Sequence, residues 1–338
     1  MTRLATPHPD DRADVAADVL LEVERLRVAL GDVRPVDGID LTLRTGETFA
    51  LLGESGCGKS MTALALMRLL PDGGRITGGS VRFHGEELLS LSEASMRSVR
   101  GGRVGMIFQE PSTSLNPVMT VSAQIGEVLA VHRGLRGAAA RGECRRLLEA
   151  VGIPDPAERL DAYPFQLSGG MKQRVMIAMA LAGEPELLIA DEPTTALDVT
   201  IQAQILDLLT GLRKETGMGL VLITHDMGVV AETAERVSVQ YAGQKIEEQP
   251  VADLFATPHH PYTAALLDAL PERATEKKLP TIPGVVPGQF DRPAGCLFSP
   301  RCKFADALCR ATPPKPQGRD LGLARCHYPL NTDERAAS

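Results

Sequence analysis

The stretch Gly53-Glu54-Ser55-Gly56-Cys57-Gly58-Lys59-Ser60 constrains this chain most, because it has the G-x-x-x-x-G-K-[ST] spacing of a phosphate-binding loop. Residues 48–52 before it, apolar from Phe49 on, predict a short buried strand. Apolar residues at helical spacing over 61–70 predict a helix that stops at Pro71. Glycines let backbone N–H groups surround a phosphate, while the helix points its positive end at the same anion. The sequence therefore predicts a nucleoside triphosphate site formed by Gly53, Ser55, Gly56, Cys57, Gly58, Lys59, Ser60 and Met61. Lys59 would neutralise the outer phosphates, and the Ser60 hydroxyl would bind Mg²⁺.

Length and charge exclude several classes of protein. The 338 residues suffice for one large or two modest domains. A net charge of −7 argues against a nucleic-acid surface, which usually needs a basic field. No apolar run approaches the ~20 residues of a membrane span, and the N-terminus lacks a signal-peptide pattern. We expect a cytoplasmic protein whose membrane role, if it has one, depends on partner chains.

The order of predicted elements indicates an α/β fold. We expect residues 1–18 to be a disordered tail, and residues 19–23, 39–43 and 79–83 to form strands of a β subdomain. Residues 112–165 have a mostly helical pattern, clearest over 121–131 and 141–151. Apolar strands at 105–108, 187–190 and 220–223 alternate with helices at 167–182, 199–214 and 227–232. This alternation predicts a mainly parallel sheet with helices on both faces.

Polar residues follow three of the apolar strands. Asp191 ends the strand at 187–190, where a carboxylate can hold Mg²⁺ through water, and the adjacent Glu192 can polarise an attacking water. Gln109 and His225 follow two other strands, at positions facing the same sheet edge. Each of these residues alone has an ordinary structural explanation, but with a phosphate loop upstream they indicate a hydrolytic nucleotide site.

The ordered set resembles the ATP-binding cassette (ABC) family. The matching pieces are Gly53–Ser60, Gln109, Leu167-Ser168-Gly169-Gly170-Met171, Leu187–Glu192, Ala196-Leu197-Asp198 and His225. The resemblance implies a P-loop NTPase fold with a parallel-sheet core, an antiparallel β subdomain and a helical subdomain at about 112–165, all within residues 19–270. It also implies that two cassettes enclose two ATP molecules head to tail.

The resemblance assigns roles to individual positions. Lys59 and Ser60 would hold phosphate and metal, and Asp191 would lie in the metal's outer shell. Glu192 would be the general base, His225 would contact the γ-phosphate, and Gln109 would link the metal and water to a transmembrane partner. Ser168, Gly169 and Gly170 would close on the ATP of the partner cassette, with Asp198 at the dimer interface.

Two positions depart from the family pattern. Met171 stands where the signature usually has Gln, a feature that resembles the members serving peptide uptake. Leu30-Gly31 stands where an aromatic residue commonly stacks on adenine. The residue that stacks on adenine in this chain is left open.

A narrower resemblance is to the ATPase subunits of dipeptide/oligopeptide permeases, closest to the dipeptide branch. It rests on residues 190–204, His259-His260-Pro261-Tyr262-Thr263, Pro283–Gly288 and a cysteine-bearing tail. It implies ATP-driven peptide import at the cytoplasmic face of the inner membrane. The expected partners are two transmembrane permease subunits, a second ATPase subunit (a homologue or a second copy of this chain), and an extracytoplasmic peptide-binding protein.

From Pro271 the composition shifts to Pro, Gly and Cys, which predicts a small C-terminal domain over 271–338. It contains Cys296, Cys302, Cys309 and Cys326. Disulfides are poorly suited to a reducing compartment, whereas four thiolates can hold zinc or an iron–sulfur cluster. The wide spacings and the family resemblance favour 4Fe–4S, with zinc and four unligated buried cysteines as alternatives.

Other functions fit the sequence less well. A soluble ABC ATPase acting on DNA or ribosomes commonly has two cassettes or basic patches, and this chain has one cassette and an acidic balance. A binding module with an inactive site is opposed by Lys59, Asp191, Glu192 and His225. The cargo is open between peptides, haem and nickel chelates.

Overall fold

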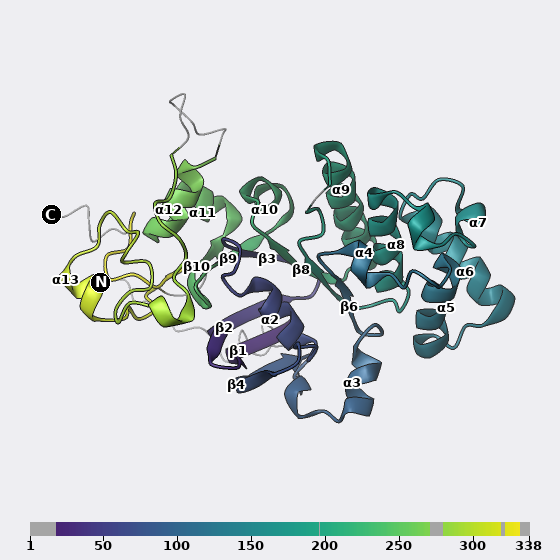
Figure 1. Ribbon diagram of the computed structural model, residues 1–338, viewed down its shortest axis with the longest axis horizontal. Helices are drawn as coiled ribbons and strands as arrows, with labels where there is room; N and C mark the ends of the chain where they lie inside the picture. Colours follow the sequence, from purple (N-terminus) through teal and green to yellow (C-terminus); the bar gives the residue numbers. More distant parts are fainter. Residues whose placement is uncertain (1–17, 196, 271–279, 319–321, 332–338) are drawn as a thin grey trace, which may run out of the picture.

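The computed structural model describes residues 18–195, 197–270, 280–318 and 322–331 (Figure 1). The tail expected over 1–18 therefore lies outside the described residues except for Asp18, whose carbonyl accepts a hydrogen bond from the Thr45 N–H at 3.0 Å. Ala196 and the start of the predicted C-terminal domain also lie outside them.

An antiparallel sheet of the strand order β2-β1-β4-β5 forms one layer of the described structure. Strand β1 pairs with β2 at Val23 and Leu41, and with β4 on its other side at Leu21 and Phe83. The strands predicted there are confirmed but are longer, because backbone pairing continues through stretches in which exposed residues interrupt the apolar runs. The bounds are β1 Val19–Leu30, β2 Val33–Arg44, β4 Gly74–Phe83 and β5 Glu86–Glu87.

The main sheet has the strand order β11-β10-β9-β3-β8-β7-β6. The strands from β9 to β6 are parallel, while β10 and β11 extend the sheet in antiparallel pairing. The predicted mainly parallel sheet is thus confirmed. The bounds are β3 Thr48–Leu52, β6 Val104–Ile107, β7 Leu187–Asp191, β8 Gly219–Thr224, β9 Arg236–Tyr241, β10 Gln244–Pro250 and β11 Leu323–Ala324.

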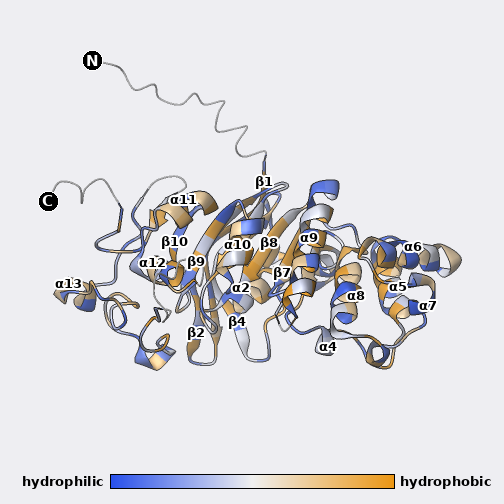
Figure 2. Cartoon of the chain, turned by 90° about the horizontal axis from the view of Figure 1, so that it is seen from above, coloured by the Kyte–Doolittle hydropathy of each residue, from blue (hydrophilic) through white to orange (hydrophobic). Residues whose placement is uncertain are grey.

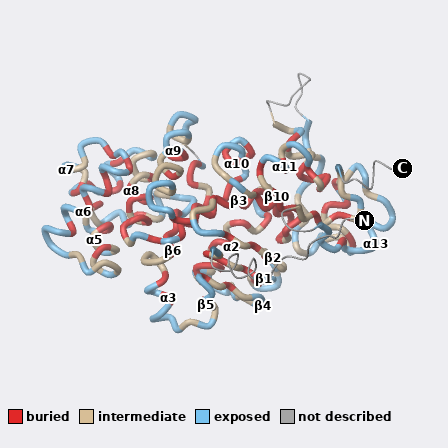
Figure 3. The backbone as a smooth tube through the Cα atoms, turned by 180° about the vertical axis from the view of Figure 1, so that it is seen from behind, coloured by how far each residue is buried: buried red, intermediate tan, exposed pale blue. Residues whose placement is uncertain are grey.

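The two faces of this sheet bury alternate residues of the same strands, as a sheet covered on both sides requires. On β7, Leu188 and Ala190 pack into a core with helices α8 and α9, whereas Leu187 and Ile189 pack toward helix α2 and the antiparallel sheet. Figure 3 shows buried backbone running through the centre of the molecule. The helices are α2 Lys59–Leu66, α8 Gly169–Leu181, α9 Val199–Thr216 and α10 Met227–Thr233.

Helix α2 differs from its predicted bounds of 61–70. It begins at Lys59, directly after Gly58, which has a left-handed conformation (φ 102°). It ends at Leu66, and Arg68 then takes a positive φ of 51°, which an α-helix does not accommodate. The apolar periodicity continued past this point because Leu70 also packs against the core.

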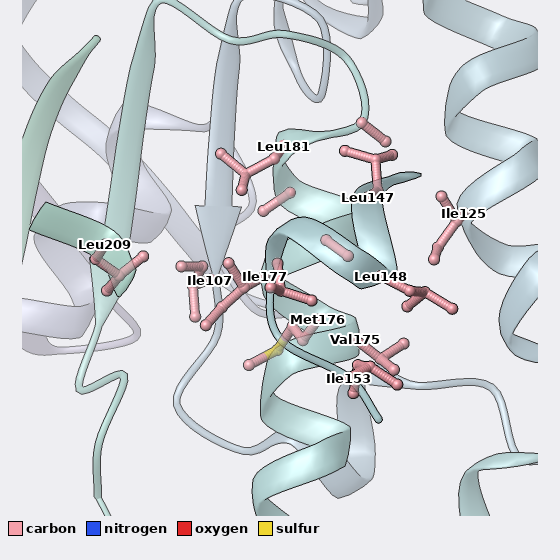
Figure 4. Close-up of a cluster of buried hydrophobic side chains, with 14 of the residues drawn as sticks. Ile107, Ile125, Leu147, Leu148, Ile153, Val175, Met176, Ile177, Leu181 and Leu209 are labelled. Atoms are coloured by element: carbon pink, nitrogen blue, oxygen red, sulfur yellow. The ribbon is translucent and has the colours of Figure 1, made fainter. Parts of the chain in front are cut away.

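The predicted helical insert is helical, and its buried side chains share one core with α8, α9 and the main sheet (Figure 4). Ile125, Leu148 and Val175 come from three successive long helices and are completely buried in it. The second helix begins at Gly137, four residues before the predicted start. The elements are α3 Glu93–Val99 before the insert, then α4 Pro111–Ser114, α5 Val121–His132, α6 Gly137–Ala150, α7 Pro156–Arg159 and the 3-10 turn η2 Pro164–Gln166.

The C-terminal elements pack against the β9–β10 edge of the main sheet (Figures 1 and 2). Tyr241 of β9, Tyr262 of α12 and Phe298 form edge-to-face contacts with ring centroids 4.8 to 5.4 Å apart. Strand β11 pairs with β10 at Glu247 and Glu248. The remaining elements are η1 Leu88–Ser90, α11 Val251–Ala256, α12 Pro261–Asp268, η4 Gln289–Asp291 and α13 Ala307–Ala311.

Candidate nucleotide-binding site

The phosphate loop connects β3 to α2 and depends on glycine at two positions. Gly53 and Gly58 have positive φ angles of 157° and 102°. A Cβ atom on Gly53 would collide with the carbonyl oxygen of Gln240, and one on Gly58 with that of Pro35. Only glycine therefore allows this loop to lie so close to the neighbouring backbone.

Lys59 is buried and folds back over the loop. Its ammonium group donates hydrogen bonds to the carbonyl oxygens of Gly53 at 2.7 Å and Glu54 at 3.2 Å. Cys57 is also buried, and burial raises the pKa of its thiol. The loop thus presents its backbone and a lysine charge, a combination suited to a polyphosphate.

Ser60, in the first turn of α2, contacts Asp191 at the end of β7. The Ser60 hydroxyl donates to the Asp191 carboxylate at 3.0 Å. Asp191 is only 5% exposed, and burial raises its pKa to about 6, with the Ser60 hydrogen bond opposing the rise and Glu192 adding to it. A buried carboxylate that gains stability from a nearby positive charge suits the surroundings of a divalent cation.

Gln109, Glu192 and His225 come together at the carboxyl ends of β6, β7 and β8. The Gln109 side-chain amide donates to a Glu192 carboxylate oxygen at 3.2 Å, and His225 Nδ1 lies 3.4 Å from the other oxygen. The Thr195 hydroxyl also donates to Glu192 at 2.8 Å. Glu192 itself has a positive φ of 47°, a strained backbone held by a hydrogen bond from its N–H to the Ile223 carbonyl. The structure therefore brings together the strand-end residues that the sequence singled out.

A hollow of about 290 Å³ lies between the phosphate loop and these strand ends. It is lined by Leu52, Gly53, Glu54, Ser55, Glu192, His225 and Leu266. Sequence reasoning did not identify Leu266 of α12, nor Tyr262, whose hydroxyl accepts a hydrogen bond from the Glu54 N–H at 3.1 Å. Tyr262 lies in the His259–Thr263 stretch that supported the narrower family resemblance, but nothing in the sequence predicts that either residue reaches the phosphate loop. Their positions depend on how α12 packs against the sheet.

A larger hollow of about 670 Å³ lies elsewhere, among α6, α8 and the end of α9. Its lining includes Leu147, Leu181 and Leu212, and it contains none of the residues predicted for nucleotide or metal. Size alone therefore does not locate the chemistry in this molecule.

The Ser168-Gly169-Gly170 segment is not part of the hollow beside the phosphate loop. The Ser168 hydroxyl caps α8 by accepting a hydrogen bond from the Met171 N–H at 3.3 Å, and Ser168 and Gly169 are exposed. Asp198 likewise caps α9, accepting from the Ile201 N–H at 2.9 Å. Both predicted interface segments are helix N-termini separate from this chain's own phosphate loop.

The four tail cysteines are unpaired and lie near one another. The Cys296 N–H donates to the Cys309 carbonyl at 2.7 Å. Burial raises the pKa of Cys326 to about 11, and the neighbouring thiols of Cys296, Cys302 and Cys309 contribute to the rise. As the side chains are placed, no group of three or more His, Cys, Asp or Glu among the described residues is arranged to hold a metal ion.

None of the helices in the described part of the chain is long and apolar enough to cross a membrane. Several apolar side chains of the helical insert are highly exposed, among them Val118 at 79%, Phe165 at 73% and Val131 at 68%. The Phe165 ring stacks on Tyr163 with centroids 5.6 Å apart.

Two family descriptions match this chain. Residues 36–195 match the family described as ABC transporter, and residues 246–309 match that described as oligopeptide/dipeptide transporter, C-terminal region. The first match contains the phosphate loop, Gln109, the Ser-Gly-Gly segment and Glu192, while the second contains α12 and three of the tail cysteines.

Whole-length relatives agree with both descriptions. The chain is 52% identical over 321 residues to a dipeptide transport ATP-binding protein of Escherichia coli strain K12, covering 92% of this chain and 97% of the relative. A protein with the same description from Haemophilus influenzae is 51% identical, covering 92% and 96%. A putative peptide import ATP-binding protein of Brucella abortus is 49% identical, covering 93% and 96%.

Solved structures resemble the cassette part. A dimeric, post-hydrolysis ATP-binding cassette, MJ0796, bound to ADP and phosphate aligns with a TM-score of 0.62 and 27% identity, over 69% of this chain and 99% of that one. CbiO1 of Clostridium perfringens, part of an ABC transporter complex, aligns with a TM-score of 0.62 and 30% identity, over 71% and 91%.

Proposed function

This chain belongs to the ABC transporter ATPases of the dipeptide and oligopeptide import branch, and from that premise we propose the role of each residue in its nucleotide site. The protein is an ATPase that energises peptide import. The observation that carries our assignment is the convergence of Lys59, Ser60, Asp191 and Glu192 on one edge of the parallel sheet.

The phosphate loop binds the triphosphate of ATP. Lys59, which here donates to loop carbonyls, would donate to phosphate oxygens, and the Ser60 hydroxyl, which here donates to Asp191, would hold the metal. Mg²⁺, when bound with ATP, supplies positive charge to the outer phosphates. The donor chemistry fits that ion: one hydroxyl and the Gln109 amide oxygen as ligands, with the Asp191 carboxylate behind them.

Glu192 is the general base that takes a proton from the attacking water. Its two oxygens are held by Gln109, Thr195 and His225, which fix the direction in which the carboxylate can accept that proton. His225 lies at the mouth of the hollow, 58% exposed at its side chain, and contacts the γ-phosphate. The exchange Glu192→Gln tests this role, because it should leave ATP bound but unhydrolysed.

The nucleotide is enclosed by a second cassette. This is supported by the separation of Ser168 and Gly170 from the chain's own hollow, and by the dimeric form described for the cassette MJ0796. The capped start of α8 in one subunit closes on ATP held by the phosphate loop of the other. We propose a homologous sister subunit as the partner, with a second copy of this chain as the alternative, and Asp198 at the contact between the two. Co-purification of differently tagged chains decides between them.

Two transmembrane permease subunits bind the cassettes at the inner membrane, whose cytoplasmic face we propose as the location of this chain. The insert supports contact with the permease, because it exposes Val118 and Phe165. In the sequence, Val118 follows Gln109 and Phe165 precedes the Ser-Gly-Gly segment. We expect Phe165→Ser to weaken co-purification with the permease while the isolated chain still binds ATP. Unchanged co-purification would place the permease elsewhere.

Peptides are the cargo, delivered by an extracytoplasmic binding protein. The dipeptide transport proteins at 51–52% identity support this over haem or nickel chelates. Uptake of a labelled dipeptide by cells that carry or lack this chain tests the assignment. Uptake that is equal in both, together with lost uptake of haem or nickel, would contradict it.

We further propose that the tail cysteines hold a 4Fe–4S cluster. Four unpaired, neighbouring thiols fit such a group chemically, although the described side chains do not converge as a metal site. Protein purified without oxygen should contain about four irons and four acid-labile sulfides per chain. Both should be lost in Cys302→Ser and kept in Cys144→Ser. Stoichiometric zinc without iron would contradict the cluster, as would the absence of both metals.

A further inference from the structure

Arg301 of the C-terminal segment reaches the phosphate loop. Its side chain is 5% exposed, and one terminal nitrogen donates to both carboxylate oxygens of Glu54, at 3.1 and 3.2 Å. The Nε–H donates to the Pro283 carbonyl at 2.8 Å, and the guanidinium also contacts the Tyr241 hydroxyl at 3.4 Å. The same terminal nitrogen thus contacts Glu54 and Tyr241, while the Nε–H bond to Pro283 fixes the orientation of the guanidinium.

Glu54 is fixed by the C-terminal half of the chain at its backbone as well. Its N–H donates to the hydroxyl of Tyr262, a buried residue of α12. Arg301 and Tyr262 lie 247 and 208 residues from Glu54 in sequence, yet both contact this one residue. Glu54 is therefore held at both its backbone and its side chain by residues outside the β3–loop–α2 unit.

The charge of Glu54 makes this contact significant. Glu54 directly follows Gly53 in the phosphate loop and lines the 290 Å³ hollow with Ser55 and Glu192. A carboxylate there repels a triphosphate and competes for Lys59, whose ammonium group already contacts the Glu54 carbonyl. Pairing with a buried guanidinium offsets that negative charge.

We propose that Arg301 is a positioning residue for ATP binding: it neutralises Glu54 and fixes this side of the phosphate loop, so that the C-terminal segment sets the affinity of the nucleotide site. The inference rests on the assignment of this loop to ATP. It gives the segment after α12 a role in the ATPase itself, independent of any metal that the segment binds.

The test is a charge-rescue experiment on the full chain, with the Kd of Mg·ATP measured by titration calorimetry. Arg301→Gln leaves Glu54 unpaired beside the triphosphate, and we expect Kd to rise about tenfold, which corresponds to about 1.4 kcal/mol. The double variant Glu54→Gln with Arg301→Gln removes both charges, and its Kd should return to within about twofold of wild type. Arg310→Gln makes the same charge change at an exposed arginine of the same segment and should leave Kd unchanged.

A double variant that binds as weakly as Arg301→Gln would overturn the proposal, because a merely structural arginine cannot be replaced by neutralising Glu54. Unchanged binding in Arg301→Gln would overturn it too. If Arg301→Gln does not fold, Arg301→Lys decides: it keeps the charge, and we expect a change in Kd below threefold, whereas a tenfold rise would refute the electrostatic role. Absence of ATP binding by the wild-type chain would instead contradict the assignment of the loop.

Discussion

His260 gives this protein a pH-dependent stability that can be calculated from its surroundings. The side chain is 1% exposed and begins α12, where its Nδ1 accepts a hydrogen bond from the Tyr262 N–H at 3.0 Å. Burial lowers its pKa from 6.5 to about 3, and a hydrogen bond with the Arg325 backbone only partly opposes this. The folded protein therefore keeps the ring neutral at pH values where the unfolded chain protonates it.

The direction of the effect follows from this difference. Since the unfolded state takes up the proton first, the contribution of His260 to the free energy of unfolding is complete above pH 6.5 and falls as the pH drops toward 3. At pH 5 the ring is 1.5 pH units below its unfolded pKa, so the loss is about 2 kcal/mol at 1.36 kcal/mol per unit.

The assay is urea unfolding between pH 5 and 7.5, followed by near-ultraviolet circular dichroism of Tyr241 and Tyr262, which contact each other and Phe298 beside this histidine. His260→Asn keeps an acceptor at the start of the helix but cannot titrate. Between pH 7.5 and pH 5, wild type should lose about 2 kcal/mol more than this variant. His259→Asn, the same exchange one residue earlier, is the matched control. Parallel pH curves for wild type and His260→Asn would refute the reasoning.

Two further substitutions separate stability from turnover. Leu148→Ala removes a completely buried side chain from the core of the helical insert and should lower the free energy of unfolding by about 2–5 kcal/mol in thermal or urea unfolding, whereas Leu148→Met should cost less than about 1.5. Ser168→Ala loses the cap of α8, worth about 1 kcal/mol, and should reduce ATP turnover of the assembled transporter by more than tenfold (about 1.4 kcal/mol) without changing ATP binding to the isolated chain. Ser168→Thr keeps the cap and is the control; full turnover in Ser168→Ala would remove this serine from the site.

The nucleotide site could be predicted from sequence because its parts are local or periodic. The phosphate loop is one continuous stretch. Asp191 ends a buried strand, and Gln109 and His225 each follow one, in a parallel sheet that brings strand ends together at one edge. Their mutual contacts with Glu192 are the consequence of that register.

Strands β9 and β10 could not be predicted from the sequence, for a physical reason. Buried positions on these strands are polar, among them Gln240, Glu247 and Glu248, and so they lack the apolar signature of a buried strand. Glu247 is buried because its carboxylate accepts the N–H groups of His259 and His260, a contact that exists only after α12 has packed. The Arg301–Glu54 pair could not be predicted either, because no sequence pattern indicates a contact between residues 247 positions apart.

ATP hydrolysis by the Glu192→Gln variant, assembled with its permease and sister subunit, tests the central claim most directly. The exchange keeps the size of the side chain and its hydrogen bonds with Gln109 and Thr195 but removes the base. We predict that turnover falls at least about 10²-fold while ATP remains bound and unhydrolysed. Hydrolysis at the wild-type rate would contradict the assignment of Glu192, and with it the mechanism proposed for this sheet edge.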